Sequence, residues 1–328
     1  MNESWPFWRR YLNLAQPRLG ADVVSVTDDF FGAAARLIRP EEPVFIPGKY
    51  DEHGKWMDGW ESRRRRDGGH DSCVVRLGGP ARVHGVDIDT RFFDGNQPLA
   101  ATIEAASESD PERADWFELL PRAELGPNAQ HRLAVVGVRT VRLLRLHIFP
   151  DGGVARLRVF GEVQPPSEAF ADESVDLAAV ENGGSVVCAS DEHFGAAAKL
   201  LLPGRGLDMG DGWETRRRRG PGFDWAILTL GRAGTIERVV LDTAHFKGNF
   251  PHQASLQGAL VTASRESLVA GSASWPELLP QQFLRANIEH EYVQELKAQG
   301  PISHLRLNIF PDGGVSRLRA FGRATQER

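Results

Sequence analysis

The sequence predicts an all-β protein made of two tandem β-sandwich domains, and three observations support this. Glycine (34) and proline (20) together make up about a sixth of the 328 residues, above the usual share of about 12% and typical of turn-rich β architecture. Long blocks of the first half of the chain return in the second half. Apolar residues alternate with a period near two in short runs bounded by turn residues, as they do in sandwich strands.

Length, composition and charge agree with this and exclude several classes. About 150 residues make a typical domain, so 328 residues predict two. Hydrophobic residues at 41%, charged residues at 25% and a formal net charge of -5 indicate a folded chain that does not bind nucleic acid. No apolar run approaches the roughly 18 residues of a membrane span, and residues 1–10 lack the apolar centre of a secretory signal. Two cysteines are too few for a disulfide framework, so we expect a cytoplasmic protein. Because no apolar run is long enough to span a membrane, we expect no membrane partner.

The duplication defines the domain organisation. The repeating unit is as large as a domain, which distinguishes it from the units of roughly 20 to 50 residues that build solenoids. We predict an N-terminal extension over residues 1–20, a first repeat over 21–162, a linker over 163–175 and a second repeat over 176–328. The blocks that recur are residues 31–37 with 194–200, 58–66 with 211–219, 89–96 with 242–249, 118–121 with 277–280 and 144–154 with 305–315.

Strands are the main element predicted within each repeat. In the first repeat they cover residues 83–89, 143–148 and 156–160, which alternate or run apolar and end at turn signals. Such short strands predict two antiparallel sandwiches.

Helix is scarce. Asp28 or Asp29 is placed to cap a short turn through residues 33–37, and residues 288–296 predict a second short helical piece. The Phe-Pro-Asp-Gly-Gly segments that begin at Phe149 and Phe310 predict tight turns.

The Asp-Gly-Trp-Glu-Ser/Thr-Arg-Arg-Arg-Arg block is the most informative stretch, because it is suited to hold an anion. If the block is extended, the glutamate and two of the four arginines share one face. A planar guanidinium presents paired donors to a carboxylate, and the glutamate accepts amide hydrogens. The alternative interpretation is a solvated or salt-bridged sheet edge. The residues that share this face are Glu61, Arg63 and Arg65 in the first repeat and Glu214, Arg216 and Arg218 in the second.

A Gly-Asn turn follows a predicted strand in each repeat. Asn96 and Asn249 offer both a donor and an acceptor, which suits a urea-like group, although they could simply shape the turn. Two neighbouring positions are phenylalanine and aspartate in the first repeat but His245 and Lys247 in the second. Histidine titrates nearest neutrality, so His245 is the better candidate for proton transfer, with a structural histidine as the alternative.

Several motifs are absent. The sequence contains no dinucleotide-binding, phosphate-loop, zinc-protease or serine-hydrolase motif. The ten histidines show no close metal-ligand pairing, so a zinc site would need ligands from distant loops. The sequence therefore requires no cofactor, while a divalent metal stays open.

Four motifs together resemble the allantoicase family. They are Phe-Phe-Gly-Ala-Ala-Ala near the start, Asp-Gly-Trp-Glu-Ser/Thr-Arg-Arg, Asp-Thr-x-x-Phe-x-Gly-Asn-x-Pro, and Leu-Arg-x-x-Ile-Phe-Pro-Asp-Gly-Gly at the end of each copy. The resemblance covers residues 23–322 in the family's two-repeat order. It implies two jelly-roll sandwiches of the galactose-binding-like type, and hydrolysis of allantoate to ureidoglycolate and urea in purine breakdown.

This resemblance assigns roles to the candidate residues. Allantoate carries one carboxylate and two ureido arms on a single carbon, so an arginine of the block would hold the carboxylate while Glu or Asn acceptors take ureido hydrogens. The nitrogen of one arm can expel the other as urea, which requires an acid at the leaving nitrogen and a base for water. We expect Glu214 or Asp211, together with His245, to supply these groups, and Lys247 to contribute to substrate binding. A metal that polarises the leaving ureide oxygen would replace the acid.

Two alternatives stay open. The first is a non-catalytic tandem β-sandwich protein that binds a small ligand or a carbohydrate, because a fold by itself does not decide function. It predicts exposed aromatic platforms, for which Trp60 and Trp213 are the candidates. The second keeps one repeat catalytic and gives the other a role in self-association. In either case we expect a homo-oligomer.

Overall fold

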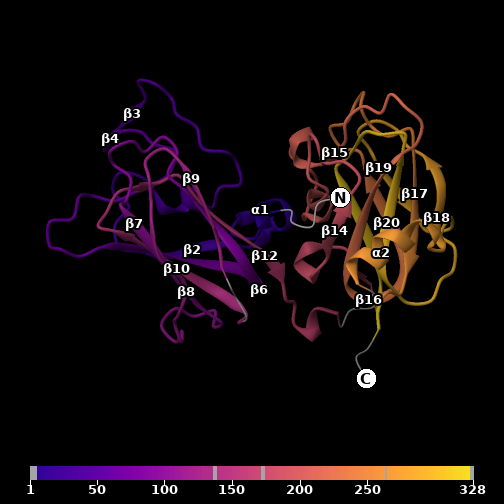
Figure 1. Ribbon diagram of the computed structural model, residues 1–328, viewed down its shortest axis with the longest axis horizontal. Helices are drawn as coiled ribbons and strands as arrows, with labels where there is room; N and C mark the ends of the chain where they lie inside the picture. The colour runs from indigo at the N-terminus through magenta and orange to yellow at the C-terminus, as the bar shows by residue number, and fades with distance from the viewer. Residues whose placement is uncertain (1–5, 136–138, 171–173, 263, 326–328) are drawn as a thin grey trace. The chain divides into compact units, whose positions relative to one another are not determined.

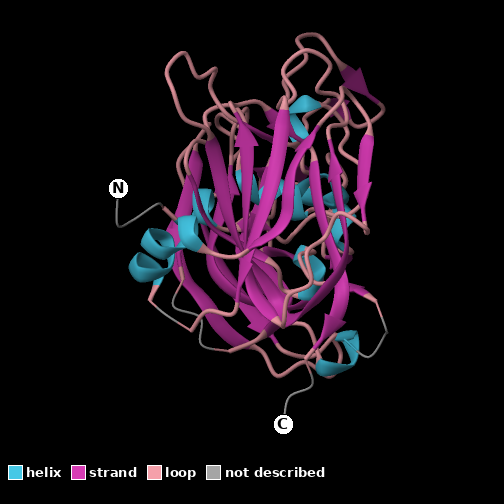
Figure 2. Ribbon diagram, turned by 90° about the vertical axis from the view of Figure 1, so that its right-hand side faces the viewer, coloured by secondary structure: helices cyan, strands magenta, loops and turns pink. Residues whose placement is uncertain are grey.

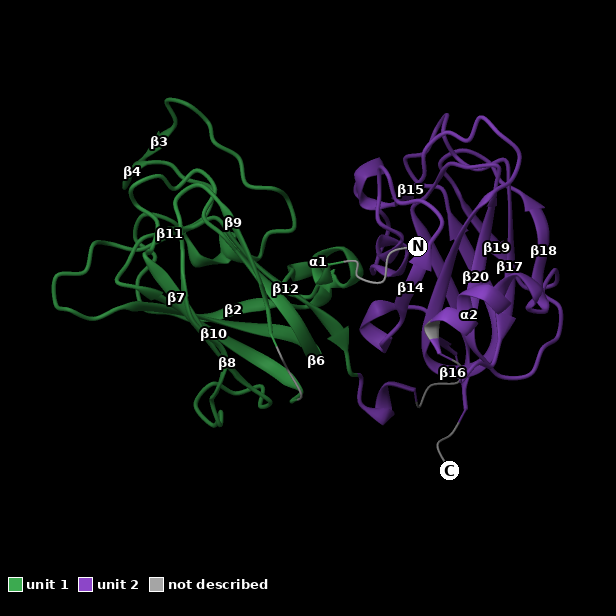
Figure 3. Cartoon of the chain, viewed as in Figure 1, with its two compact units in different colours: residues 1–164 green, residues 165–328 purple. Residues whose placement is uncertain are grey.

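The structure is a computed structural model that describes residues 6–135, 139–170, 174–262 and 264–325. The chain forms two compact units, and the boundary between them lies between Gln164 and Pro165 (Figure 3). Strands dominate both units and the helical pieces are short (Figure 2), which confirms the predicted all-β class. Residues 1–5 of the predicted extension, 171–173 of the predicted linker and 326–328 of the predicted second repeat lie outside the described residues.

In the first unit one long strand connects the two layers of the sandwich. The antiparallel order is β1-β12-β6-β10-β7-β8, with β2 and β9 also paired to β6 (Figure 1). The first part of β6 pairs with β10 and β2, and its last part pairs with β12 and β9. The strands are β1 Leu12–Asn13, β2 Asp22–Val26, β3 Tyr50–Asp51, β4 Gly54–Lys55, β5 Trp60–Glu61, β6 Asp71–Asp89, β7 Ala100–Ala106, β8 Phe117–Glu124, β9 Gln130–Ala134, β10 Val141–Phe149, β11 Gly153–Val154 and β12 Arg156–Val163.

The second unit repeats the topology of this main sheet, and the two-stranded sheet β3–β4 has no counterpart among its described residues. Its order is β13-β22-β16-β20-β17-β18, with β14 and β19 also paired to the long strand β16. The strands are β13 Val175–Asp176, β14 Ser185–Ala189, β15 Trp213–Glu214, β16 Asp224–Asp242, β17 Gln253–Ala259, β18 Glu277–Phe283, β19 Glu289–Tyr292, β20 Ile302–Phe310, β21 Gly314–Val315 and β22 Arg317–Ala324.

Helical pieces connect the strands at the ends of the sandwiches. The piece predicted near residue 33 is η2, and the Asp29 carboxylate accepts the Ala34 N–H at 3.3 Å near its start. The pieces are α1 Phe7–Arg10, η1 Pro17–Leu19, η2 Ala34–Ile38, η3 Ser167–Phe170, η4 Val180–Asn182, η5 Ala197–Leu201, η6 Met209–Asp211, α2 Arg265–Gly271 and η7 Ser272–Ser274. Within the described residues, no helix is long and apolar enough to cross a membrane.

Each core consists of the inward-facing residues of these strands. Ile88, Ile103 and Leu144 of the first unit have no exposed surface, and Leu241 and Leu307 have none in the second. Burial of such side chains contributes about 1.5 to 3 kcal/mol each, so the alternating pattern read from the sequence is what holds the layers together.

A glycine lies in each long strand where another segment of the chain passes against it. A Cβ on Gly78 would lie 1.6 Å from the Leu19 carbonyl oxygen, and a Cβ on Gly231 would lie 1.6 Å from that of Asn182. No side chain fits at either position, so the same backbone crossing is built into both repeats.

Two segments differ from the sequence expectations. Leu12–Asn13, placed in an N-terminal extension, pairs with Gly161 and Phe160 just as Val175–Asp176 pairs with Gly322 and Phe321. Residues 288–296 were predicted to be helical, and this was wrong: Glu289–Tyr292 is strand β19. The pairing of β19 with β16 buries His290 and Tyr292, so tertiary pairing prevails over a weak local preference for helix.

Candidate active site

The two recurring glutamates lie at equivalent points of the two sandwiches, each bonded on both sides through its backbone. Glu61 pairs with Gly153 on one side and forms a bridge with Gly32 on the other. Glu214 does the same with Gly314 and Gly195. The side chain of each glutamate therefore projects from a fixed backbone position.

Each glutamate accepts a hydrogen bond from the asparagine of the Gly-Asn turn. The Nδ2 atom of Asn96 donates to Glu61 Oε1 at 2.8 Å, and Asn249 Nδ2 donates to Glu214 Oε1 at 2.5 Å. The structure thus brings together two pairs of predicted site residues. Burial raises the pKa of Glu61, and the hydrogen bond from Asn96 and the charge of Lys55 only partly offset it.

The four arginines do not lie on a strand as expected. The strand ends at Glu61 in one repeat and at Glu214 in the other. Residues 62–66 and 215–219 follow as irregular segments, called here the arginine loops. The expected alternation of faces therefore does not apply beyond the glutamates.

Two aspartates hold each arginine loop by its backbone. In the second repeat the Arg216 N–H donates to Asp191 Oδ1 at 2.9 Å, and the Arg218 N–H donates to Asp312 Oδ2 at 2.6 Å. Arg217 lies between these two bonds. The first repeat has the same arrangement: the Arg63 N–H donates to Asp28 at 3.1 Å, and the Arg65 N–H to Asp151 at 2.7 Å.

The arginines predicted to bind substrate are ion-paired instead. Arg63 pairs with Asp28 at 2.6 Å and Arg216 pairs with Asp191 at 2.9 Å. Arg65 pairs with Asp71 and Asp67, and Arg218 pairs with Asp224. Their charges are therefore already matched, and these four side chains stabilise the loops.

Of the two remaining arginines of this loop, Arg217 and Arg219, Arg217 lines a cavity in the second repeat. The cavity has a volume of about 390 Å³, within the range of about 300 to 1,000 Å³ usual for small-molecule sites. Among the described residues Arg217 has no ion-pair partner, so its guanidinium is available to a ligand. The polar and charged side chains that line the cavity are Glu214, Thr215, Arg217, Asn249, His252 and Asp312, and the aromatic ones are Phe194 and Phe250.

His252 was missed by the sequence analysis. It lies three residues beyond Asn249, just after the Gly-Asn-Phe-Pro motif, and its backbone N–H donates to the Phe310 carbonyl at 2.9 Å. The equivalent residue of the first repeat is Leu99. This difference between the repeats was the signal that could have identified it, because it introduces a titratable side chain next to a shared motif.

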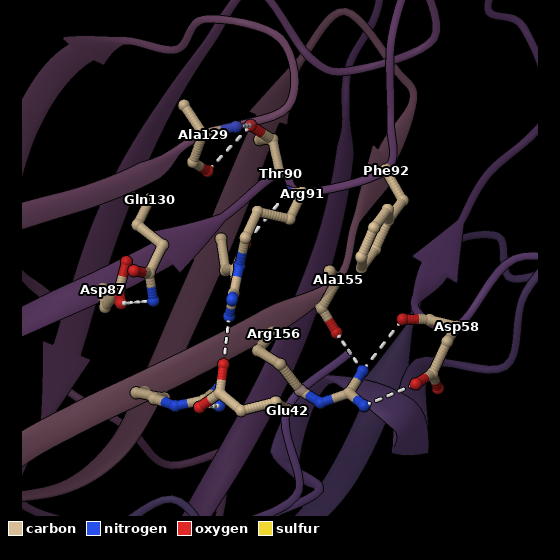
Figure 4. A network of polar contacts seen from close by, with 12 residues as sticks. Glu42, Asp58, Asp87, Thr90, Arg91, Phe92, Ala129, Gln130, Ala155 and Arg156 are labelled. Atoms are coloured by element: carbon tan, nitrogen blue, oxygen red, sulfur yellow. Dashed lines mark hydrogen bonds and ion pairs between the residues drawn. The ribbon is translucent and has the colours of Figure 1, made fainter. Parts of the chain in front are cut away.

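Asp211, expected to be catalytic, is an ion-pair partner instead. Its carboxylate contacts the Arg317 guanidinium at 2.7 Å, and that arginine side chain is 2% exposed. The equivalent pair in the first repeat is Asp58 with Arg156, also at 2.7 Å (Figure 4). Asp211 does not line the cavity, and removal of either partner of such a pair would leave a largely buried charge uncompensated.

His245 and Lys247 also lie outside the cavity lining. The His245 ring bonds the Gly206 carbonyl through Nε2 at 2.7 Å, and its backbone has a φ of 70°. Phe92 has a φ of 69° at the same point of the first repeat, so this conformation belongs to the turn and not to the histidine. Lys247 is exposed.

Trp60 and Trp213 have no exposed surface. Their indole N–H groups donate to the carbonyls of Asp28 at 2.8 Å and Asp191 at 2.9 Å. Neither ring can therefore serve as an exposed platform for a sugar, the role for which these two residues were the candidates.

No metal-binding cluster is evident. Within the described parts of the chain, no group of three or more His, Cys, Asp or Glu side chains comes together as a metal site would require.

Comparisons with known proteins agree with one another. A family model described as the allantoicase repeat matches residues 12–164 and 175–325. The chain is 54% identical over 321 residues to "Probable allantoicase 2" of Burkholderia pseudomallei, with 96% of each chain covered. It is 51% identical over 326 residues to "Probable allantoicase" of Pseudomonas syringae pv. syringae, with 98% of each covered. The crystal structure of allantoicase from Saccharomyces cerevisiae is similar, with a TM-score of 0.77, 37% identity, and coverage of 95% of this chain and 92% of that one.

Proposed function

The chain belongs to the allantoicase family, and we propose that it hydrolyses allantoate to ureidoglycolate and urea in the cavity of its second repeat. It is a hydrolase that acts on a small molecule, as the similarity over nearly the whole chain implies. The substrate and the role in allantoin degradation follow from the family.

One observation supports the placement in the second repeat. Glu214, Arg217 and His252 line a single cavity of about 390 Å³ there. They supply a carboxylate acceptor, a cation and an imidazole that can donate and accept a proton, which are the three properties that this reaction requires.

Binding uses two groups of the cavity that have bonding capacity left within the described residues. The Arg217 guanidinium takes the substrate carboxylate through paired N–H donors. Glu214 Oε1 already accepts from Asn249. Glu214 Oε2 has no donor among the described residues and takes a ureido N–H. Phe194 and Phe250 are the aromatic residues that line the site.

The reaction proceeds in two steps that conserve atoms and protons. In the first, the nitrogen of the retained arm forms a C=N bond and gives its proton to Glu214, while protonated His252 donates to the nitrogen of the leaving arm and urea departs. In the second, water adds to the C=N carbon. His252 takes the proton of that water and Glu214 returns its proton to the nitrogen. Each positioned proton transfer contributes roughly 10²- to 10⁴-fold to the rate.

Purified protein incubated with allantoate, with urea measured over time, tests this proposal. Glu214→Gln keeps the size of the side chain but cannot take the proton, so kcat should fall about 10²- to 10⁴-fold. Glu61→Gln is the matched control and should leave kcat unchanged. Equal losses in both variants would contradict a single hydrolytic site.

We propose that the side chains act without a metal. The test is the same assay after prolonged EDTA treatment and again after addition of Mn²⁺ or Zn²⁺. Urea release should be unaffected by either; loss with the chelator and recovery with the metal would require a cation in the mechanism.

We also propose a cytoplasmic location and self-association. The location is supported by composition, because two cysteines are too few for a disulfide framework. Fractionation of cells that express the chain tests the location. Light scattering on the eluting protein, compared with the monomer mass of 36.2 kDa, tests the oligomer.

A further inference from the structure

The backbone that shapes the cavity of the second repeat recurs in the first. The N–H of Gly153 donates to the Asn96 carbonyl at 2.8 Å, as that of Gly314 does to Asn249. The other bonds that join the loops also match. Phe31 N–H to Glu61 O and Phe194 N–H to Glu214 O are both 3.2 Å, and so are Ser62 N–H to Gly152 O and Thr215 N–H to Gly313 O.

The first repeat also presents the same anion-binding group. Arg64 lies between the bonds that Arg63 and Arg65 make to Asp28 and Asp151, just as Arg217 lies between its own two neighbours. Its side chain is exposed, and within the described residues it has no ion-pair partner. Because its backbone is held on both sides while its charge is unmatched, Arg64 is suited to bind a carboxylate.

A matching acceptor accompanies it. Glu61 Oε1 accepts from Asn96 at 2.8 Å, whereas Glu61 Oε2 has no donor among the described residues. Because this carboxyl is largely buried, a ligand that donates N–H groups to Glu61 Oε2 would satisfy an acceptor that is otherwise costly to leave without a donor.

The proton-transfer group is what the first repeat lacks. Leu99 stands where the second repeat has His252, and Gln97 stands where it has Phe250. Neither replacement can protonate a leaving nitrogen. The retained groups suffice to bind, and the missing one is required only for the reaction.

We propose that the first repeat contains a second ligand site, in which Arg64, Glu61 and Asn96 bind a small carboxylated ureide without hydrolysing it. The class of ligand rests on the function proposed above for the second repeat. The chain therefore binds two ligand molecules, of which it converts one.

N-carbamoylglycine is a suitable probe, because it has one carboxylate and one ureido arm on the same carbon. It lacks the second arm, so it cannot release urea by the route described. Equilibrium dialysis of the radiolabelled compound against the full chain, at the lowest concentration that saturates the wild type, counts the bound molecules.

We expect two molecules bound per wild-type chain, one in Arg64→Ala, one in Arg217→Ala, and none in the double variant. Removal of a charge-assisted contact of about 1.5 to 3 kcal/mol lowers affinity at one site by about 10- to 150-fold. Arg66→Ala and Arg219→Ala are matched controls, since both side chains are exposed cations of the same loops, and both should bind two.

Fewer than two molecules bound to the wild type at saturation, including none, overturns the inference. So does binding of two by Arg64→Ala. Urea release from allantoate, measured on the same samples, separates this from the proposed function. If Arg217→Ala loses activity and also all binding, the second repeat is the hydrolytic site and the first-repeat site does not exist. If Arg64→Ala loses activity and Arg217→Ala keeps it, the placement of the hydrolytic site is wrong.

Discussion

The two repeats share the bonds that position their loops but differ in side chains that face the cavity. Each has a glutamate held by an asparagine, a buried tryptophan bonded to a carbonyl, and an arginine loop bonded to two aspartates. At one position next to these shared groups the second repeat has His252 and the first has Leu99. Identical motifs in duplicated domains therefore indicate a common backbone, whereas the differences beside those motifs indicate which copy does chemistry.

The sheets differ as well. In the first repeat His70, His147 and Glu104 form a chain of contacts of 2.9 Å each on the outer face. The equivalent residues of the second repeat are the neutral Phe223, Asn308 and Gln257. There η7 packs over the sheet, where Arg306 donates to Ser272 at 2.6 Å. The divergence extends beyond the cavity.

The largest effect is expected at the position that distinguishes the repeats. His252→Asn removes the proton donor and should lower kcat for urea release about 10²- to 10⁴-fold. Leu99→Asn, its counterpart, should leave kcat unchanged. The pH profile of kcat for the His252→Asn variant should also lose the side of the curve that depends on the histidine. A variant profile that falls on both sides, as in the wild type, would assign the acid to another group.

The second prediction concerns the two equivalent ion pairs, Asp58 with Arg156 and Asp211 with Arg317, whose loss should destabilise both repeats. Arg156→Met and Arg317→Met each remove a buried cation from its pair with Asp58 or Asp211, at a cost of about 3 to 5 kcal/mol in the free energy of unfolding. Asp58 is the more buried carboxylate, 5% exposed against 11% for Asp211, but it keeps Arg39 at 3.4 Å, so the two losses should be similar. Urea unfolding followed by tryptophan fluorescence measures both; a loss below about 1 kcal/mol in either would mean that the pair is not desolvated.

The third prediction compares the equivalent exposed arginines of the two repeats, Arg217 and Arg64. Arg217→Ala should lower kcat/KM for allantoate about 10- to 100-fold, mostly through KM, because it removes one charge-assisted contact with the carboxylate. Arg217→Lys should recover part of this, since it restores the charge but not the paired donors. Arg64→Ala should leave steady-state kinetics unchanged. Equal increases of KM in both alanine variants would indicate that both repeats contribute to one hydrolytic site.

The smallest effect concerns the aspartates that hold the arginine loops. The pKa values of Asp28 and Asp191 are both lowered. Burial by itself would raise them, but the hydrogen bonds outweigh burial: Arg63 donates to Asp28, and the Arg216 and His193 N–H groups donate to Asp191. A carboxyl with a lower pKa in the folded chain stabilises it above the unfolded pKa of about 3.9, and this contribution is lost as the pH falls through the folded pKa. Asp28→Asn and Asp191→Asn should each cost up to about 1 kcal/mol at pH 7, because the arginines are largely exposed.

Unfolding measured at pH 7 and near pH 2 checks this. Each variant should differ from the wild type at neutral pH and converge with it in acid. A difference that persists at pH 2 would show that the aspartates act through packing and not through their charge.

Much of the site could be predicted from the sequence because its parts recur. Glu61 with Asn96, and Glu214 with Asn249, were identified from shared motifs, and the structure brings each pair into contact. The choice among the arginines could not be made in this way. All four recur in both repeats, so recurrence does not show which of them Asp28, Asp71 and their counterparts would pair with.

The amino-acid sequence by itself determined the duplication, the all-β class and the motifs that meet at the ends of the sandwiches, because periodicity and turn residues act locally along the chain. Only the tertiary structure decided that Arg217 faces the cavity while Arg216 and Arg218 pair with acids, and that Asp211 pairs with Arg317. The physical reason is that a charged side chain goes to the counter-charge nearest in space. Asp211 lies 106 residues from Arg317 and Asp191 lies 25 from Arg216, so their proximity depends on how the chain folds, whereas Asp224 lies only 6 residues from Arg218.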